Sequence, residues 1–275
     1  MTLRLAVAQL SPEPAAVSRN LAAAREAVAA AADRDADLLL LPELWDAGYF
    51  AFDAYGRIAE SVAGDRLTGL AERAADADLA LLAGTVVEDL AASAADGIDT
   101  PEPTGLANTA VLFDADGRRR AIYRKHHLFG YESAEAELLE PGQRLETATV
   151  GEFTVGIATC YDLRFPEQFR ALTDRGADLL CVPSAWPYPR VEHWRTLTEA
   201  RAVENLSFLA AANGVGEQGD AELAGRSVVY DPWGTTLAAA STEPTVLTAD
   251  LEPDRVTAVR EEFDTLSDRR VYDTT

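Results

Sequence analysis

Lysine is almost absent from this sequence of 275 residues. It occurs once, at Lys125, so the other members of the 24 Lys and Arg are all arginines. These basic residues are outnumbered by 46 Asp and Glu, which gives a formal net charge of −22. Such a field disfavours binding to nucleic acid or to an anionic membrane, and neither is expected as a partner. The acid excess and the preference for arginine indicate a protein of a high-salt cytoplasm, where salt screens the self-repulsion.

Cysteine and long apolar runs are also scarce. The two cysteines, Cys160 and Cys181, are too few for a disulfide framework. No stretch approaches the roughly 20 apolar residues of a membrane span, and the start "MTLRLAVAQL" lacks the apolar core and cleavage site of a signal peptide. Because 48% of the residues are hydrophobic, the chain is expected to fold rather than to be disordered. We expect a soluble, cytoplasmic protein with one domain over residues 1–275.

Short apolar runs that alternate with helical patterns predict an α/β fold. Strands are expected at Leu3–Leu10, Asp37–Pro42, Leu79–Val87, Thr109–Phe113, Thr154–Thr159, Asp178–Pro183, Phe208–Asn213, Ser227–Tyr230 and Val246–Asp250. Helices are expected at Ala15–Arg34, Arg66–Ala77, Pro166–Arg175 and His193–Asn205. The stretch 90–105 has no periodicity, and we expect an exposed loop there.

Two segments of the chain resemble each other. "DRDADLLLLPELW" (33–45) and "DRGADLLCVPSAW" (174–186) agree at eight of thirteen positions. Each joins the end of a predicted helix to a buried strand, then to a proline and a tryptophan. The repetition predicts a layered fold with approximate internal symmetry. Functional groups are then expected just past the carboxyl ends of the strands, where open α/β sheets bind ligands.

A glutamate follows the first of these strands. Glu43 comes directly after Pro42, at the end of a run of four leucines. A carboxylate in such apolar surroundings is poorly solvated, so its pKa should be raised, which suits a general base or acid near neutral pH. We therefore interpret Glu43 as a candidate catalytic residue.

A cysteine occupies a comparable place in "TVGIATCYDLRFPEQFRAL" (154–172). Cys160 ends an apolar strand, and a helical pattern begins within a few residues. Strand–turn–helix geometry presents a nucleophile at a sharp bend, and a nearby helix N-terminus is expected to favour the thiolate. The backbone N–H of Tyr161 is expected to face a developing oxyanion. Cys181 lies between apolar residues within a strand, and we interpret it as a small buried hydrophobe.

The single lysine fits the needs of that cysteine. A thiol nucleophile requires a base and an oxyanion partner, and Glu43 and Lys125 are the candidates for these roles. An ammonium is a compact charge with three donors, and a guanidinium does not replace it. This requirement would explain why one lysine persists in a chain that otherwise uses arginine.

Three sequence blocks carry a family resemblance. "LLLPELW", "YRKHHLF" and "GIATCYDLRFPE" occur in the order of the signature blocks of the nitrilase superfamily, the carbon–nitrogen hydrolases, and the chain resembles that superfamily over almost its whole length. The resemblance implies a four-layer αββα sandwich within one domain, and homodimers or larger homo-oligomers. We expect the C-terminal segment, about 253–275, to serve in packing or oligomer contacts. The resemblance also implies a Glu–Lys–Cys triad on Glu43, Lys125 and Cys160, without a metal or organic cofactor.

The resemblance extends to a second glutamate and to a substrate pocket. A further catalytic glutamate is implied six residues before the proline of the "PG" turn at 141–142, which gives Glu135, with Glu132 and Glu137 as rivals. The "WP-x-PR-x-x-HW" run and the "ARA-x-EN" pattern within 184–216 resemble the branch that contains ω-amidases. These enzymes hydrolyse the side-chain amide of 2-oxoglutaramate and 2-oxosuccinamate through a thioester, with release of ammonia. The implied substrate-binding residues are Trp186 as a pocket wall, Arg190 as a bidentate partner of a substrate carboxylate, and Tyr49 and Phe129.

Three alternatives stay open at this point. The same chemistry could act on a nitrile, an N-carbamoyl amine or a deaminated-glutathione-like amide. A metal hydrolase built on His126, His127 and His193 is disfavoured, because adjacent histidines point apart on a strand and no HExxH pattern occurs. We interpret His193 instead as a residue that caps and packs the helix it begins. A non-catalytic interaction protein on the same fold is disfavoured because all three triad residue types are present.

Overall fold

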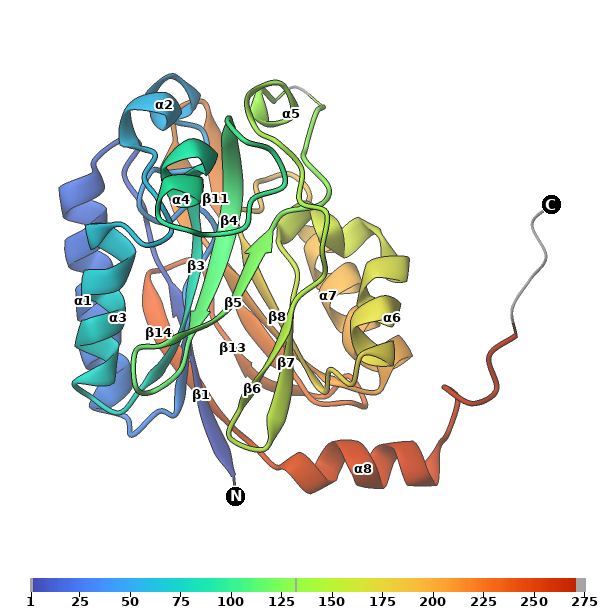
Figure 1. Ribbon diagram of the computed structural model, residues 1–275. Coiled ribbons are helices and arrows are strands. Elements are labelled where there is room, and N and C mark those ends of the chain that lie inside the picture. Colours follow the sequence, from blue (N-terminus) through green and yellow to red (C-terminus); the bar gives the residue numbers. More distant parts are fainter. Residues whose placement is uncertain (1, 132, 271–275) are drawn as a thin grey trace.

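The computed structural model describes residues 2–131 and 133–270, which form four layers (Figure 1). The first sheet has the order β14–β1–β2–β3–β4–β5, with bounds Leu3–Gln9 (β1), Leu38–Leu40 (β2), Ala80–Asp89 (β3), Leu106–Phe113 (β4), Arg119–Arg124 (β5) and Thr245–Leu251 (β14). The second has the order β13–β12–β9–β8–β7–β6, with bounds Thr147–Val150 (β6), Phe153–Ile157 (β7), Leu179–Ser184 (β8), Phe208–Asn213 (β9), Val228–Tyr230 (β12) and Thr236–Ala239 (β13). A separate hairpin joins β10 (Val215–Gln218) to β11 (Ala221–Ala224).

Helices cover the outer face of each sheet. In Figure 1, α1 (Val17–Ala32) and α3 (Asp65–Ala75) lie on one side, and α6 (Pro166–Asp174) and α7 (Val191–Asn205) lie on the other. The remaining helices are short or peripheral: η1 (Phe52–Ala54), α2 (Tyr55–Ile58), α4 (Leu90–Ala95), α5 (Glu135–Leu138), η2 (Cys160–Arg164) and α8 (Pro253–Glu262). The predicted αββα sandwich is confirmed. That residues 1–275 form one domain stays a prediction.

The alternation of side chains along the strands explains the layering. In β2, Leu38 and Leu40 belong to the core between the two sheets, whereas Leu39 belongs to the core under α1 and α3. In β8, Cys181 lies between the sheets and Leu180 packs toward α6 and α7. Successive residues of a strand point to opposite faces, so a strand buried on both faces must be apolar throughout. This explains the continuous leucine-rich runs in the sequence.

The two similar segments occupy equivalent positions. Residues 33–45 begin directly after α1 and contain β2, which pairs in parallel with β1 and β3. Residues 174–186 contain the end of α6 and β8, which pairs in parallel with β7 and β9. The approximate internal symmetry predicted from the sequence is therefore present in the strand topology.

The expectation for residues 90–105 was wrong in part. The segment begins with α4, whose first turn is capped by Asp89, since the Asp89 side chain accepts a hydrogen bond from the backbone N–H of Ala92 at 3.1 Å. Its apolar positions are too few to show a helical period, so capping and packing decide the conformation. The edge strands β5, β6 and β13 and the hairpin β10–β11 were not predicted either, because charged, short or glycine-flanked strands carry weak patterns.

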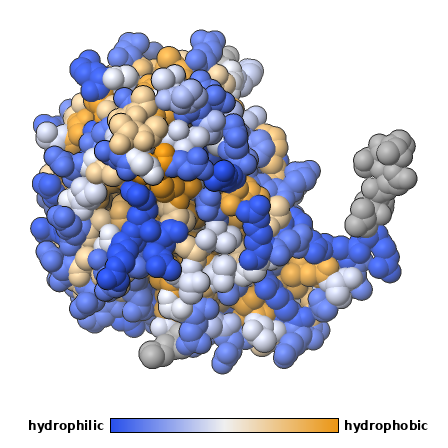
Figure 2. Space-filling model, viewed as in Figure 1, coloured by the Kyte–Doolittle hydropathy of each residue, from blue (hydrophilic) through white to orange (hydrophobic). Residues whose placement is uncertain are grey.

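The C-terminal part of the described chain forms α8, which extends along one end of the molecule (Figure 1). Val256 and Val259 are buried, and the Arg260 guanidinium donates to the Ser207 hydroxyl at 2.8 Å. Glu132 and residues 271–275 lie outside the described residues. Within the described ranges no helix has the combination of length and apolar character that a membrane crossing requires. Figure 2 shows a face covered mainly by hydrophilic residues, with apolar residues in small areas.

Candidate active site

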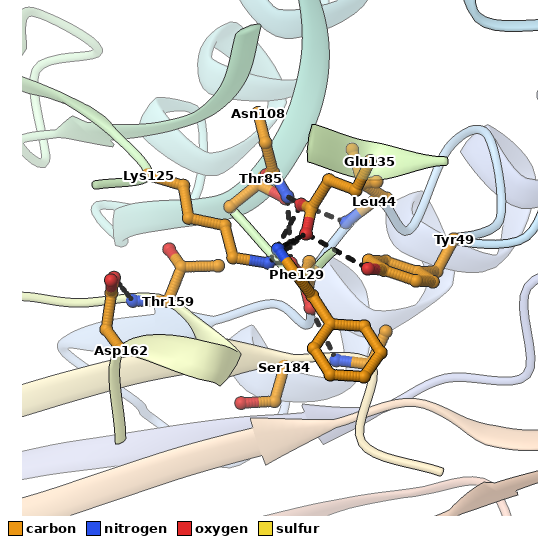
Figure 3. A network of polar contacts seen from close by, with 12 residues as sticks. Leu44, Tyr49, Thr85, Asn108, Lys125, Phe129, Glu135, Thr159, Asp162 and Ser184 are labelled. Carbon is orange, nitrogen blue, oxygen red and sulfur yellow. Dashed lines mark hydrogen bonds and ion pairs between the residues drawn. The ribbon is translucent and has the colours of Figure 1, made fainter. Parts of the chain in front are cut away.

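The predicted catalytic side chains meet at the carboxyl ends of strands from both sheets. Glu43 follows β2, Lys125 directly follows β5, and Cys160 follows β7. The N–H of Ala185, just after β8, donates to Glu43 Oε2 at 2.8 Å, so the end of β8 borders the same space. Figure 3 shows this polar network around the Lys125 ammonium. The sequence-based expectation that functional groups lie past the strand ends agrees with this arrangement.

Lys125 is enclosed by carboxylates. Its side chain is fully buried, and Nζ donates to Glu43 Oε1 at 2.8 Å and to the two oxygens of Glu135 at 2.8 and 2.9 Å. An ammonium has three donors, and in this arrangement carboxylate oxygens take all three. Burial alone would lower the pKa of Lys125, but the charges of Glu135 and Glu43 raise it well above its usual value. The lysine is therefore charged near neutral pH despite its burial.

The carboxylate of Glu43 is held on both oxygens. Besides the bonds from Lys125 and Ala185, Oε1 accepts from the Asn108 side-chain amide at 2.8 Å. Burial raises the pKa of Glu43, whereas the neighbouring Lys125 charge lowers it. The net effect is a pKa above the usual value. The sequence-based expectation of a raised pKa is confirmed. A carboxyl of this kind can exchange a proton near neutral pH.

Cys160 sits at a strained bend. Its φ is 46°, in the left-handed region, which costs a non-glycine residue roughly 1–2 kcal/mol. It begins the short 3₁₀ helix η2, and only 7% of its surface is exposed. Burial raises the pKa of the Cys160 thiol well above its usual value, and the Glu43 charge raises it further, against the opposing effect of Lys125. Burial and the Glu43 charge therefore oppose the thiolate at rest, and a favourable effect of the helix N-terminus stays a prediction.

The second cysteine has a different environment. Cys181 lies within β8 in the core between the sheets, with no exposed surface. Burial alone raises the pKa of its thiol to about 12. This agrees with the interpretation of Cys181 as a buried hydrophobe.

The structure distinguishes between the candidate second glutamates. Glu135 is fully buried at the start of α5 and contacts Lys125, Asn108 and the hydroxyl of Tyr49, the last at 3.0 Å. Its Oε2 also accepts from the N–H of Phe129 at 2.7 Å. Glu137 is exposed on the other side of α5, and Glu132 lies outside the described residues. The catalytic role of Glu135 stays a prediction.

An apolar pocket opens beside Cys160. It contains about 370 Å³ of empty space, including its mouth. All four predicted substrate-binding residues line it: Tyr49, Phe129, Trp186 and Arg190. The other lining residues are Cys160, Tyr161, Phe50, Arg164, Ala185 and Pro187. The structure thus brings the predicted pocket together from three distant parts of the chain.

Two guanidinium groups border this pocket. Arg190 lies over the Phe129 ring at 5.3 Å, and among the described residues it has no acidic partner. Arg164 lies over the Trp186 ring at 5.0 Å and hydrogen-bonds His193 Nδ1 at 3.2 Å. Sequence reasoning did not identify Arg164, although it belongs to the "CYDLRFPE" block. Both cations are placed where an anionic part of a ligand could reach them.

The three histidines do not converge. His127 Nδ1 lies 2.7 Å from Asp162, the ring of His126 stacks on Tyr123, and His193 is exposed beside Arg164. Within residues 2–131 and 133–270, no group of three or more His, Cys, Asp or Glu side chains is placed to hold a metal ion. The prediction of a reaction without metal or cofactor stays a prediction.

One residue of the network was missed in the sequence. The Asn108 amide donates to Glu43 at 2.8 Å and to Glu135 at 2.9 Å, and so separates and orients two carboxylates. The available signal was a buried amide in the otherwise apolar strand "LANTAVLF", since buried polar side chains have hydrogen-bond partners.

A thiol, a carboxylate and an ammonium that meet at the strand ends of a four-layer sandwich are the arrangement expected of the nitrilase superfamily. The family description "Carbon-nitrogen hydrolase" matches residues 4–261, and the chain belongs to this family. It is therefore a hydrolase of carbon–nitrogen bonds.

Named relatives agree with this membership. The chain is 39% identical over 240 residues to a 2-oxoglutaramate amidase of Paenarthrobacter nicotinovorans, covering 86% of this chain and 79% of that protein. It is 31% identical to an omega-amidase of Mus musculus, covering 98% and 95%. Among solved structures, it is similar to an amidase mutant from Nesterenkonia sp. AN1 that shows Michael addition of acrylamide at the active site cysteine. That likeness has a TM-score of 0.79 and 32% identity, and covers 96% of this chain and 99% of the other.

Proposed function

We propose that the protein is an ω-amidase, which hydrolyses the terminal amide of small 2-oxo acid amides such as 2-oxoglutaramate or 2-oxosuccinamate. The observation that carries the proposal is the pocket in which the Cys160 thiol and the Arg190 guanidinium face one narrow apolar space. Such a pocket suits a short ligand with a neutral amide at one end and a carboxylate at the other. The 2-oxoglutaramate amidase and omega-amidase names of the relatives support the same substrate class.

The first half of the reaction forms a thioester. Glu43 takes the proton of the Cys160 thiol as sulfur attacks the amide carbon, so that an S–C bond forms and the carbonyl oxygen becomes an oxyanion. Because burial favours the protonated thiol at rest, this transfer accompanies the attack rather than preceding it. Glu43 then gives the proton to the leaving nitrogen, the C–N bond breaks, and ammonia departs.

The oxyanion is stabilised by a fixed charge and a backbone donor. Lys125 supplies the charge, and the N–H of Tyr161 supplies the hydrogen bond, since it directly follows the nucleophile at the start of η2. Glu135 holds Lys125 with two hydrogen bonds, and so fixes the position of the ammonium. It also orients Tyr49 and Phe129 of the pocket wall.

The second half of the reaction cleaves the thioester. Glu43 removes a proton from water as the water oxygen attacks the acyl carbon. The C–S bond then breaks, and the proton returns from Glu43 to the sulfur of Cys160. The products are ammonia and a dicarboxylate, and the enzyme is regenerated without an added cofactor.

Substrate selection rests on the pocket lining. Arg190 pairs with the substrate carboxylate in bidentate fashion, while Trp186, Tyr49 and Phe129 enclose the short carbon chain. Trp186 is fixed for this role, because its indole N–H donates to the carbonyl of Arg190 at 2.9 Å and its backbone N–H donates to Asn213 at 2.7 Å.

A kinetic panel tests the proposal. Ammonia release is measured in molar salt with 2-oxoglutaramate, 2-oxosuccinamate, an aliphatic amide without a carboxylate, a nitrile and an N-carbamoyl amine. The highest kcat/KM is expected for the 2-oxo acid amides. A preference for the nitrile or the carbamoyl compound would replace the ω-amidase assignment with another activity of the family.

We also propose that the enzyme works as a homo-oligomer in a high-salt cytoplasm. Support for association comes from exposed apolar residues near the C-terminal segment: Phe263 and Trp233 are 51% and 38% exposed, and their rings lie 5.6 Å apart. Two free thiols support a reducing compartment. Mass measurement by light scattering should give a multiple of 29.5 kDa, and Phe263→Ser should shift it toward the monomer.

Salt dependence follows from the net charge of −22. The thermal midpoint should rise from dilute to molar salt, because the Debye length falls to about 3 Å at 1 M and self-repulsion is screened. Midpoints that do not change over this range would remove the high-salt proposal and leave the proposed reaction intact.

A further inference from the structure

We propose that His127 and Asp162 are positioning residues that fix the main chain around Cys160 relative to the main chain around Lys125. The inference rests on the proposed function, because it assigns these side chains to the same reaction. Among the described residues, neither side chain lines the pocket, so they act through the residues they hold.

Asp162 is the centre of this arrangement. Its carboxylate is fully buried and accepts four hydrogen bonds. Oδ2 accepts from the Tyr123 hydroxyl at 2.6 Å and from the Thr159 backbone N–H at 2.8 Å. Oδ1 accepts from the His127 backbone N–H at 3.1 Å and lies 2.7 Å from the His127 Nδ1. A carboxylate offers only acceptors, so we assign the Nδ1 proton to His127.

These bonds join the two segments that carry the proposed nucleophile and the proposed cation. Thr159 directly precedes Cys160, and His127 lies two residues after Lys125. One carboxylate therefore binds the backbone on both sides, although the segments lie far apart in the sequence. Figure 3 shows Asp162 bonded to Thr159 beside the extended Lys125 side chain. The strained φ of Cys160 needs such fixation, because a strained conformation persists only where its surroundings enforce it.

The His127 ring is held on its face as well as at its edge. It stacks on Phe165 with ring centroids 3.6 Å apart and planes 10° apart. Phe165 directly follows η2, so the ring contacts this short helix at its middle residue, Asp162, and just after its end, at Phe165. Removing only the Nδ1 hydrogen bond should make the position of Cys160 and η2 less fixed without disrupting the packing of the core.

His126 provides a matched control. Its ring stacks on Tyr123 with planes 3° apart, but among the described residues its Nδ1 has no hydrogen-bond partner. Burial lowers the pKa of His126, so the ring is neutral near neutral pH. A phenyl ring can replace it without removing a charge or a hydrogen bond to Asp162. The two adjacent histidines therefore differ in the contact that the inference concerns.

The experiment compares His126→Phe, His127→Phe and His127→Asn in the full-length enzyme. Each variant is measured for kcat and KM, for the rate at which iodoacetamide alkylates Cys160, and for the thermal midpoint. His127→Phe should lower kcat by about 10- to 100-fold, the effect of a misplacement of about 1 Å, and should change the alkylation rate. Its KM should stay within about twofold, because the pocket is intact. His127→Asn, whose amide can reach Asp162 in place of Nδ1, should recover most of kcat.

Three results would overturn the inference: kcat equal in His127→Phe and His126→Phe, no recovery in His127→Asn, or a fall in the thermal midpoint without a change in kcat below it. The last would indicate a structural role only.

Failure of the proposed function is distinguishable from these results. If the wild-type enzyme released no ammonia from ω-amides, the alkylation rates of the same variants would still decide whether His127 positions Cys160. Asp162→Asn should match His127→Phe in kcat if it folds, and the histidine variants decide the question if it does not.

Discussion

The two similar segments of the chain end in different ways. Residues 33–45 lead from α1 through β2 to Pro42 and Glu43, and residues 174–186 lead from α6 through β8 to Pro183 and Ser184. The register extends the correspondence to the neighbouring strands, because Val7 pairs with Leu40 and Ile157 pairs with Cys181. Three residues further along, the first half has Leu10 and the second has Cys160. Glu43 of the first half therefore corresponds to Ser184 of the second, and Cys160 of the second half corresponds to Leu10 of the first. In each half, only one of the two strand ends has a predicted catalytic residue.

The reactive residues of the two halves form one site because the strand ends touch. The Glu43 N–H donates to the carbonyl of Ser184 at 3.3 Å, and the Ala185 N–H donates to the Glu43 carboxylate at 2.8 Å. The base of the proposed reaction therefore comes from one half and the nucleophile from the other. The symmetric backbone brings the strand ends of the two halves into contact, and individual side chains at these ends provide the proposed catalytic groups.

The two tryptophans of the segments show the same contrast. Trp45 is fully buried under the helices of the first sheet, and its indole N–H donates to the carbonyl of Ala83 at 2.6 Å. Trp186 lines the pocket beside Cys160. Equivalent sequence positions therefore serve packing in one half and line the pocket in the other.

The largest expected effect separates the two cysteines. Cys160→Ala should abolish turnover, because no other nucleophile sits at the bend, while the fold is retained. Cys181→Ala should keep most of the activity and lose packing in the core between the sheets. Ammonia release and far-ultraviolet circular dichroism of both variants check this. An inactive Cys181→Ala beside an active Cys160→Ala would reverse the assignment.

The next effect separates Glu43 from its counterpart Ser184. Glu43→Gln keeps the shape but cannot accept the thiol proton, so kcat should fall by about 10²–10⁴-fold. Ser184→Ala should have little effect, since within the described part of the chain its hydroxyl makes only one hydrogen bond, to the carbonyl of Val182 at 3.4 Å. Steady-state kinetics of the two variants provide the measurement, and similar losses in both would remove Glu43 from the role of base.

A third effect concerns the lysine. Lys125→Arg keeps the charge but places a broad planar group in a fully buried space between two carboxylates. The rate should fall by about 10²–10³-fold, as when one group that stabilises the oxyanion is removed. Near-normal kcat in Lys125→Arg, measured in molar salt, would show that any cation suffices and that Lys125 is not a specific oxyanion partner.

The smallest effect is the position of the acid limb of the pH profile. Glu43 acts as a base in its ionised form, so activity should be present above its pKa and lost as the pH falls through it. Because burial raises that pKa above the usual value of 4.5, the loss should begin at a higher pH than for an exposed glutamate. The pH dependence of kcat/KM in the range where circular dichroism is unchanged tests this, and a flat profile down to pH 4.5 would contradict it.

The sequence predicted well the strands and helices whose burial imposes an apolar pattern, and the catalytic candidates whose residue type is distinctive. The strands β2 and β8 and the helices α1, α3, α6 and α7 carry apolar patterns imposed by two-sided burial, and these elements were predicted close to their observed bounds. The edge strand β5 was not predicted, because "RRAIYR" buries only every second residue. Lys125 was nevertheless found, because its residue type is unique in the chain.

Contacts between distant segments could not be predicted from local patterns. Asn108 binds Glu135, 27 residues away, and Asp162 binds Tyr123 and His127, 39 and 35 residues away, in addition to the nearby Thr159. The protonated state of Cys160 was also missed, because the extent of burial depends on packing of both sheets. Arg164 was missed since only the folded chain shows that it borders the pocket.

The whole proposed reaction depends on one step, in which Cys160 attacks an ω-amide and carries the acyl group. The most direct test mixes the wild-type enzyme with 2-oxoglutaramate, stops the reaction with acid within milliseconds, and locates the acyl adduct by mass spectrometry of proteolytic peptides. We expect a thioester on the peptide that contains Cys160, formed together with a burst of ammonia, and none on the peptide that contains Cys181. A burst of ammonia with no adduct on Cys160, or with the adduct on Cys181, would contradict it.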